Sequence, residues 1–311
     1  MSKNPKVSII ILHLKDIPCL VDCIASLNKI TYQNYDIIIV HNGPKDKTLL
    51  EALHPISQHI LKVIDTGENI GFAKANNMGI LEAINNGADY ILLLNDDTVV
   101  AKDFLDILVE AGENNHDAGM LGPNIYLYKE PQKIWFSGAK FDKKTVGISF
   151  TNAGEIDTDK TLETQETDFI TGCTVLVKKE IIEKIGLLDE RFFIYWEDVD
   201  WGLRVKKAGM KNLVIPRSKI WHKVTVSLGG QESPIRIYLK TRSHLLLAKI
   251  HAPKAKKRLI LRFIRDIGWL LFKSSDPDKT KKARAYFAAI KDYYLRKTDR
   301  GPLWLWENKE S

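Results

Sequence analysis

Adjacent carboxylates follow one of the most apolar runs of the chain. Asp96 and Asp97 come directly after Asp89–Leu94 (DYILLL) and Asn95. Two neighbouring carboxylates at the end of a buried strand can hold Mg²⁺ or Mn²⁺, and such an ion neutralises the charge that develops on a departing diphosphate. A turn in which Asp or Thr caps the next helix has the same composition. These residues alone leave both interpretations open and favour the turn.

A second acidic group is enclosed by aromatic side chains. Glu197, Asp198 and Asp200 lie between Trp196 and Trp201. A carboxylate that aromatic rings shield from water has a raised pKa, which suits it to accept a proton from a hydroxyl group. Acidic residues in the first turn of a helix also stabilise the helix dipole. We favour that structural role for Asp200 and leave both roles open for its two neighbours.

A glycine-containing segment could approach a nucleotide with its backbone. Within Asp65–Ile80 (DTGENIGFAKANNMGI), Gly67 and Gly71 permit tight turns. The segment contains neither G-x-G-x-x-G nor G-x-x-x-x-G-K-[ST], so it is neither a dinucleotide fingerprint nor a P-loop. By itself it is a weak indication of a nucleotide site.

The histidine and cysteine residues allow several roles. His222 follows the apolar run Leu213–Ile215, where an imidazole could complete a metal shell made of oxygen atoms or serve only as a hydrogen-bonded structural residue. Cys19 and Cys23 have no further ligands at metal-binding spacing, so we expect them to pack in the core. Three cysteines cannot form a fully paired disulfide framework, which predicts a reducing, cytoplasmic environment.

The elements that position these residues alternate between strand and helix. Short β-branched runs predict strands at Val7–Leu14, Tyr35–His41, Asp89–Leu94 and Asp168–Lys178. Further segments predict helices at Leu20–Asn28, Leu49–Leu53, Phe72–Asn86, Phe104–Glu113, Glu180–Ile185 and Val199–Lys207. This alternation predicts an α/β, Rossmann-like fold with a mostly parallel sheet flanked by helices, and ligands bind beyond the carboxyl ends of such strands.

Composition excludes several classes of protein. The 311-residue chain is 44% hydrophobic and 27% charged, unlike collagen-like, disordered or all-membrane proteins. We expect no secretory leader and no membrane-spanning segment, because no apolar stretch reaches the ~18 uncharged residues that a spanning helix needs. The net charge of +7 is uneven, since residues 236–311 contain 20 Lys and Arg against 7 Asp and Glu. A basic region of this kind meets the phosphates of a nucleic acid or of an anionic membrane.

Residues 256–273 of this basic region predict an amphipathic helix. Its basic stripe consists of Arg258, Arg262, Arg265, Trp269 and Lys273. Its apolar stripe consists of Ile260, Phe263, Ile264, Ile267 and Leu271. The apolar stripe could pack on the rest of the protein. Alternatively the helix could lie on a membrane, which the excess of positive charge and the tryptophans favour.

Taken in order, these segments resemble the glycosyltransferases of family 2, and especially their bacterial rhamnosyltransferase-like branch. The segment VSIIILHLKD matches the family's first strand, and IIIVHNGPKD matches its nucleotide motif. The segment ENIGFAKANNMGI matches its N-x-G-F-A-x-x-N-N-x-G motif. The branch's variant of the D-x-D metal motif is matched by LLLNDDT. An acceptor-side block ending in E-D is matched by FITGCTVLVKKEIIEKIGLLDERFFIYWEDVDWGLRVKKAG. The resemblance covers nearly the whole chain and implies the GT-A fold.

The resemblance also implies roles for individual residues. It places the catalytic base at Asp198, with Glu197 orienting the acceptor, and it places a divalent cation, Mg²⁺ or Mn²⁺, at Asp97 and His222. The donor-binding residues that it implies are His41, Asn42, Asn69, Gly71, Phe72, Asn77, Asn95 and Asp96.

Two motifs depart from the family's pattern. Relatives usually have Thr-Tyr-Asn where this chain has His13-Leu14-Lys15, and Asp-Asn-Gly-Ser where it has His41-Asn42-Gly43-Pro44. The Asp that His41 replaces normally contacts the nucleobase. The choice of nucleobase is therefore open, and Lys15 or His41 could meet the phosphate or the base differently.

Together these observations predict an inverting glycosyltransferase. It would move rhamnose or another hexose from a nucleotide-diphosphate sugar to a hydroxyl of a glycan acceptor, one that is lipid-linked, in cell-surface polysaccharide synthesis. The expected organisation is a GT-A domain over residues 1–235, with a nucleotide-sugar half to about residue 122 and an acceptor half over 123–235, followed by a basic helical region over 236–311. We expect that region to hold the protein on the inner face of the cytoplasmic membrane.

Two other classes of function are weaker alternatives. A basic nucleic-acid-binding protein would interleave aromatic and basic residues, and this chain does not, so we expect no nucleic-acid partner. A sugar-phosphate nucleotidyltransferase needs a glycine-rich loop with an arginine after the first strand, and Leu12–Ile17 (LHLKDI) supplies none.

Overall fold

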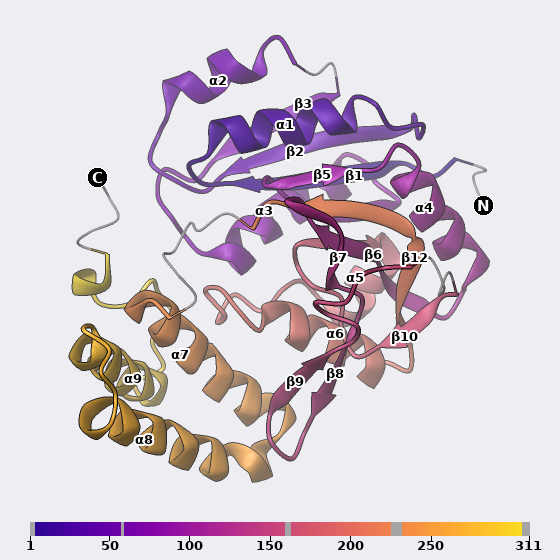
Figure 1. Ribbon diagram of the computed structural model, residues 1–311. Coiled ribbons are helices and arrows are strands. Elements are labelled where there is room, and N and C mark those ends of the chain that lie inside the picture. Colours follow the sequence, from indigo (N-terminus) through magenta and orange to yellow (C-terminus); the bar gives the residue numbers. More distant parts are fainter. Residues whose placement is uncertain (1–3, 57–58, 159–162, 225–231, 307–311) are drawn as a thin grey trace.

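The computed structural model describes residues 4–56, 59–158, 163–224 and 232–306. Its centre is a ten-stranded sheet (Figure 1). The strands of this sheet are β1 (Val7–His13), β2 (Tyr35–His41), β3 (Ile60–Asp65), β4 (Tyr90–Asn95), β5 (Thr98–Val100), β6 (Ala118–Leu127), β7 (Glu130–Phe136), β10 (Gln165–Thr167), β11 (Thr174–Lys178) and β12 (Lys211–His222). A separate hairpin pairs β8 (Ala139–Asp142) with β9 (Gly147–Phe150).

The sheet is mostly parallel, as predicted. Its main path runs β10-β12-β6-β11-β4-β1-β2-β3, while β5 pairs with β12 and β7 pairs with β6. Strands β3, β2, β1 and β4 are parallel, and β11 runs antiparallel to both β4 and β6. Because β11 is antiparallel to both of its neighbours, β6 runs in the same direction as β4, and β12 is parallel to β6. The carboxyl ends of β1, β2, β4, β6 and β12 therefore face the same side of the molecule.

Helices cover both faces of the sheet. They are α1 (Ile17–Leu27), α2 (Lys47–Leu53), α3 (Phe72–Asn85), α4 (Phe104–Asn114), α5 (Lys179–Ile185), α6 (Glu197–Lys207), α7 (Pro234–His251), α8 (Lys256–Phe272) and α9 (Lys279–Tyr294). Figure 1 shows α1 and α3 on opposite sides of the N-terminal strands, as right-handed crossovers require. Helix α3 can lie close to β1 because Gly79 has no side chain; a Cβ there would lie 2.5 Å from Ile10 Cγ2.

Local signals explain where several helices begin. The Asp16 side chain accepts a hydrogen bond from Cys19 N (3.1 Å) at the start of α1, and Asp46 does the same with Thr48 N (2.9 Å) at the start of α2.

The first strands are buried on both faces, as their uninterrupted β-branched runs predict. Strands β3 and β5 were not anticipated from the sequence, because each is short and mixes polar with apolar residues.

One predicted strand is shorter than expected. Residues 168–173 of the predicted strand Asp168–Lys178 form a loop, and β11 begins at Thr174. The Asp168 carboxylate is bound by Lys206 Nζ (2.5 Å) and by the backbone N–H of Phe141 (2.6 Å), which ties the start of this segment to α6 and β8. The loop that results carries Thr171, Gly172 and Cys173 to the carboxyl-end side of the sheet.

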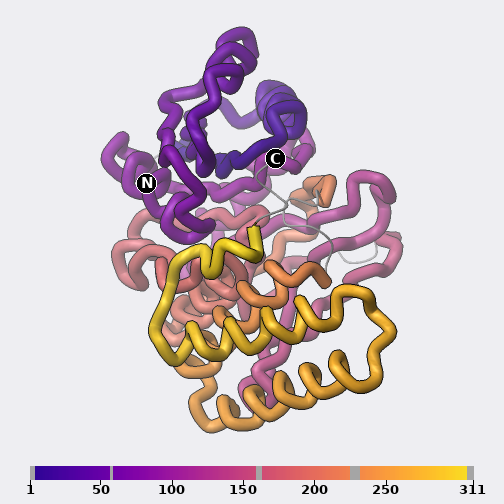
Figure 2. The backbone as a smooth tube through the Cα atoms, turned by 90° about the vertical axis from the view of Figure 1, so that its left-hand side faces the viewer, coloured from indigo at the N-terminus to yellow at the C-terminus, as the bar shows by residue number. Residues whose placement is uncertain are grey.

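The three C-terminal helices pack against one another and against the rest of the protein (Figure 2). Leu245 and Leu247 of α7 and Phe263 of α8 belong to the same buried core as the central strands. A second buried cluster joins Phe193 to Tyr238 of α7 and to α9. The division into domains at residue 235 stays a prediction, but a continuous core crosses it.

The apolar stripe predicted for α8 is only partly buried. The side chains that α8 buries are Leu259, Phe263, Ile267 and Leu270. Ile264 and Leu271, which belong to the predicted apolar stripe, are 52% and 37% exposed. The helix carries apolar residues on both sides, so its sequence alone did not decide which side contacts α7 and α9. Among the described residues, no helix has the length and apolar character needed to cross a membrane.

Candidate active site

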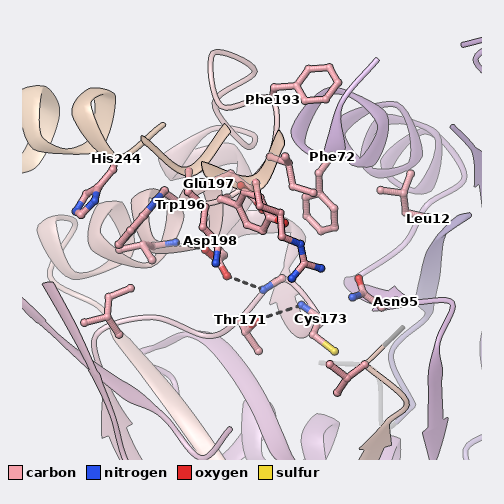
Figure 3. A pocket seen from close by; sticks show the side chains of 18 of the residues that line it. Leu12, Phe72, Asn95, Thr171, Cys173, Phe193, Trp196, Glu197, Asp198 and His244 are labelled. Carbon is pink, nitrogen blue, oxygen red and sulfur yellow. Dashed lines mark hydrogen bonds between the residues drawn. The ribbon is translucent and has the colours of Figure 1, made fainter. Parts of the chain in front are cut away.

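A cavity of about 1230 Å³ opens at the carboxyl ends of the central strands. Strands β1 and β4, the loop before β11, the first turn of α6, the end of β12 and helix α7 all contribute to its wall. Figure 3 shows Glu197 and Asp198 in the middle of this site, with Trp196 and His244 on one side and Asn95 on the other.

Asp97 and His222 meet at one end of the cavity. The antiparallel pairing of β5 with β12 places His222 opposite Thr98, next to Asp97 in the chain. The His222 Nε2 atom lies 3.0 Å from Asp97 Oδ1, and the N–H of Lys223 donates to the backbone oxygen of Asp97 (2.8 Å). Burial opposes the charged form of His222, but the neighbouring Cys173 and Asp97 outweigh burial and raise its pKa to about 10. The pair is therefore an ion pair when no other cation is bound.

The chemistry of this pair fits a divalent cation. A carboxylate oxygen and an imidazole nitrogen are both ligands of Mn²⁺ and related ions. In the part of the chain that the structure describes, no cluster of three or more His, Cys, Asp or Glu side chains could hold a metal without help. A two-residue site needs further oxygen ligands, which a diphosphate and water supply. Asp97 and His222 are thus suited to an ion that arrives with a phosphorylated ligand.

Asp198 lies in the first turn of α6, where two backbone groups orient its carboxylate. The N–H of Gly172 donates to Oδ2 (3.1 Å) and the N–H of Val199 donates to Oδ1 (2.8 Å). Burial raises the pKa of Asp198, and these hydrogen bonds oppose the rise. Burial and the neighbouring Asp198 raise the pKa of Glu197 well above its ordinary value. An oriented carboxylate with a raised pKa is suited to accept a proton near neutral pH.

The backbone before this turn is held in an unusual conformation. Tyr195 and Trp196 both have positive φ angles (70° and 73°), which cost a residue with a side chain about 1–2 kcal/mol each. The Trp196 ring stacks on His244 of α7 with their centres 4.0 Å apart and their planes 19° apart. The carbonyl of Phe193 accepts the N–H of Phe72 (2.6 Å). These contacts at both ends of the segment hold the strained turn that aims Glu197 and Asp198.

Asn42 and Asn69 tie the end of β2 to the loop before α3. The Asn42 side chain donates to Asn69 Oδ1 (3.2 Å) and accepts the N–H of Ile70 (2.9 Å). Gly71 is required at its position because its φ is 95° and a Cβ would lie 2.7 Å from the carbonyl oxygen of Phe193. The segment is therefore built as a rigid wall of the cavity.

Most of the site residues predicted from the sequence line this cavity, namely Asn42, Asn69, Phe72, Asn95, Asp96, Asp97, Glu197, Asp198 and His222. Three do not. Gly71 acts through its backbone, and His41 is buried with its Nε2 atom 2.8 Å from the carbonyl oxygen of Pro44. Asn77 donates to the carbonyl oxygen of Leu188 (2.9 Å) and accepts its N–H (3.1 Å), so it supports the loop before α6.

A buried histidine pair beside Asp96 was not predicted. His13 Nδ1 lies 2.7 Å from Asp96 Oδ2, and the His13 ring stacks on His41 at 5.6 Å. The two histidines stand on neighbouring strands in register, at the ends of β1 and β2. The sequence offered a signal for this pair, since both residues are departures from the family's pattern. The parallel register is what brings the two departures together.

Helix α7 supplies residues that the sequence division at 235 assigned to a separate region. Lys240, Thr241 and His244 all line the cavity. Burial lowers the pKa of His244 to about 4, so this residue is neutral at neutral pH. No sequence motif predicted these residues, because they reach the cavity only through the packing of α7 against α6.

Asp200 has the structural role that the sequence favoured. Its carboxylate lies 2.8 Å from Arg204 Nε and 2.7 Å from His251 Nε2, and only 2% of its side chain is exposed. It thereby fastens α6 to the last turn of α7.

Comparison with known proteins agrees with this geometry. The family model described as glycosyl transferase family 2 matches residues 8–186. The dTDP-rhamnosyl transferase RfbF of Shigella flexneri is 27% identical over 242 residues, which cover 74% of this chain and 76% of the relative. The N-acetylglucosaminyl-diphospho-decaprenol L-rhamnosyltransferase of Mycobacterium tuberculosis is 24% identical over 249 residues, which cover 74% of this chain and 80% of the relative.

A solved structure shares the fold over almost the whole chain. The crystal structure of GalNAc-T7 with UDP, GalNAc and Mn²⁺ superposes with a TM-score of 0.67 and 16% identity over 99% of this chain, which spans 57% of that longer protein. This likeness confirms the GT-A fold. The family match covers more than half of the residues, and the chain therefore belongs to glycosyl transferase family 2.

Proposed function

We propose that this glycosyltransferase is a metal-dependent, inverting enzyme that transfers a hexose such as rhamnose from a nucleotide-diphosphate sugar to a hydroxyl group of a glycan. The observation that carries the proposal is the arrangement of Asp97, His222 and Asp198 around one cavity. The donor's diphosphate belongs at the end with Asp97 and His222, and the acceptor hydroxyl belongs beside Asp198. Rhamnose is the sugar named for the two relatives, which supports this choice.

The donor would be held by residues from several elements. Asp97 and His222 would hold Mg²⁺ or Mn²⁺, which when bound neutralises the charge on the leaving diphosphate. Asn95 and Asp96 at the end of β4, with Asn42 and Asn69 in the wall of the same cavity, would bind the nucleoside. His13 holds Asp96 in place through their 2.7 Å contact.

The transfer itself needs one base on one face of the sugar. The acceptor oxygen forms a bond to the anomeric carbon while the bond from that carbon to the diphosphate oxygen breaks. Asp198 takes the proton of the acceptor hydroxyl, and the nucleoside diphosphate leaves with the electron pair of the broken bond. Attack opposite the leaving group inverts the anomeric configuration, by the logic that separates inverting from retaining glycosidases. Glu197, the residue before Asp198 in the chain, would orient the acceptor.

The acceptor is proposed to be a lipid-linked glycan at an anionic membrane. One face of helix α8 is exposed and carries both apolar and basic residues. We call this the outer face of α8, and it comprises Lys257, Arg258, Leu261, Ile264, Arg265, Trp269 and Phe272. Leu261 and Phe272 are 65% and 85% exposed, and Arg265 is 76% exposed. Apolar side chains among cations match the acyl chains and anionic headgroups of a lipid surface, where each basic residue contributes on the order of 1 kcal/mol.

A screen of nucleotide sugars tests the proposed transfer. Purified protein is incubated with a panel of UDP, dTDP and GDP sugars, with Mn²⁺ or with chelator, and nucleoside diphosphate release is measured with and without acceptor glycan. We expect metal-dependent release with one sugar, and a product whose anomeric configuration is opposite to that of the donor by NMR. A product with retained configuration would contradict the inverting mechanism.

A further inference from the structure

We propose that the end of the cavity formed by α7 and α8 is a subsite for a phosphate or diphosphate group carried by the acceptor. Three basic side chains line this end, Arg236 and Lys240 of α7 and Arg262 of α8, and we call them the cationic cluster. The inference rests on the proposed transfer to an acceptor hydroxyl. It adds a requirement that the transfer chemistry does not impose, namely that the acceptor is negatively charged near the hydroxyl it offers.

The cationic cluster has no carboxylate partner among the residues that the structure describes. Arg236 Nε is buried without any hydrogen-bond partner. The Lys240 ammonium lies over the Tyr195 ring, 5.3 Å from its centre. Arg262 Nη2 lies 3.5 Å from His244 Nδ1, and its guanidinium lies over the Phe263 ring. All three therefore keep donor groups available for an anion.

Other basic residues of the same layer behave differently. Arg204 of α6 is bound to Asp200 at 2.8 Å and also donates to backbone carbonyls. Lys206 of the same helix is bound to Asp168 at 2.5 Å. Both of these cations are thus paired with a carboxylate of the protein. The cationic cluster received none.

The cluster is costly unless something neutralises it. Arg236 and Lys240 are one turn apart on the same helix face, and like charges at this spacing repel. Burial and the positive charge of Arg236 lower the pKa of Lys240, and the carboxylate of Glu232 opposes this change. The carboxyl groups of the α6 turn that line the same cavity are Glu197 and Asp198, and burial raises the pKa of both. Groups placed at such a cost beside an active site indicate binding of a ligand.

The position of the cluster points to the acceptor and not to the donor. The donor's diphosphate belongs with Asp97 and His222. Figure 3 shows His244 and Trp196 on the side of Asp198 that is opposite to Asn95. Arg262 contacts His244, and Lys240 covers Tyr195, the residue before Trp196. Arg262 and Lys240 therefore lie across the proposed base from the donor site.

A diphosphate that links a sugar to a lipid has the chemistry that this subsite would bind. Guanidinium and ammonium groups form charge-assisted hydrogen bonds with phosphate oxygens. Helix α8 presents Arg262 to the cavity while its outer face, with Leu261 and Phe272, points to solvent. A lipid held at that outer face could thus extend its diphosphate into the cavity.

Direct binding of geranyl diphosphate tests the subsite without any need for turnover. Calorimetric titrations use the full chain with its donor site occupied by Mn²⁺ and an excess of UDP and dTDP. The variants are Lys240→Gln and Arg262→Gln, with Lys249→Gln as a matched control, because Lys249 is an exposed residue on α7 outside the cavity. Geraniol is the uncharged probe. Lys240→Arg restores the charge, and thermal unfolding verifies that each variant is folded.

We expect the wild type and Lys249→Gln to bind geranyl diphosphate equally. Each cluster variant should bind it about 10-fold or more weakly, since each loses a charge-assisted hydrogen bond, and Lys240→Arg should recover most of the affinity. Geraniol should bind all variants alike. Equal affinity of folded Lys240→Gln, Arg262→Gln and wild type would overturn the proposal. So would displacement of geranyl diphosphate by the nucleotides with Mn²⁺, which would assign the cluster to the donor's diphosphate. Failure of the proposed transfer would appear separately, as absence of sugar release in the nucleotide-sugar screen.

Discussion

Replacing Asp198 by Asn should separate catalysis from folding. Asn has nearly the same shape but cannot take a proton from the acceptor hydroxyl. Loss of a general base typically lowers a rate by about 10²–10⁴-fold. Donor binding should be unchanged, because the Asp198 carboxylate is held by Gly172 and Val199 on the acceptor side of the cavity.

The cost to stability can be worked from the same contacts. The Asn side chain keeps one oxygen, so one of the two N–H groups that Asp198 accepts loses its partner, a cost of about 1–3 kcal/mol. Removing this buried charge offsets part of that cost, because burial disfavours the charge of Asp198, and the charge of Asp198 in turn disfavours that of Glu197. We therefore expect the free energy of unfolding to fall by less than about 2 kcal/mol.

Asp200→Asn is the matched control, two residues away on the same helix. Asp200 is bound to Arg204 and His251 and lies almost wholly out of solvent, so its loss should cost about 3–5 kcal/mol, as for other buried ion pairs broken on one side. Its turnover per folded molecule should be close to that of the wild type.

The assay measures transfer rate, donor affinity and urea unfolding for Asp198→Asn, Asp200→Asn and Glu197→Gln. We expect a large loss of rate in Asp198→Asn with little loss of stability, and the reverse in Asp200→Asn. If Asp198→Asn kept its rate within about 10-fold of the wild type while Glu197→Gln lost it, the base would be Glu197 and the reasoning from orientation would be refuted.

Three further outcomes are expected. Asp97→Asn, or excess chelator with the wild type, should nearly abolish transfer, and full turnover in chelator would exclude a metal. Asp97→Asn should still fold but unfold at a lower temperature than the wild type, because His222 loses its buried carboxylate partner. Burial lowers the pKa of His244 from 6.5 to about 4, so between these pH values the unfolded chain binds more protons than the folded protein. The contribution of neutral His244 to stability is therefore complete above pH 6.5 and is lost as the pH falls to 4. The loss should be about 3 kcal/mol in urea unfolding, and His244→Gln should flatten that part of the profile. Leu261→Ser and Phe272→Ser should each weaken binding to anionic vesicles about 10-fold, and equal, negligible binding of the wild type to anionic and neutral vesicles would leave α8 a structural element.

The central strands and the acidic motifs were predictable from the sequence because their signals are local. A continuous β-branched run such as Val7–His13 suits only a strand that is covered on both faces. The position of Asp97 after one strand and of Asp198 at the start of a helix follows from the order of the elements. The resemblance to family 2 rested on these same segments and was confirmed.

Contacts between distant segments were decided only by the tertiary structure. The His13–Asp96 and His222–Asp97 pairs each depend on the register of two strands, which local sequence does not specify. Helix α8 carries apolar residues on both sides, so packing against α7 and α9 chose the stripe that it buries. The same packing brought Lys240 into the cavity, from a region that composition alone had set apart. Local patterns determine which elements form, whereas the fit of their surfaces determines which side chains meet.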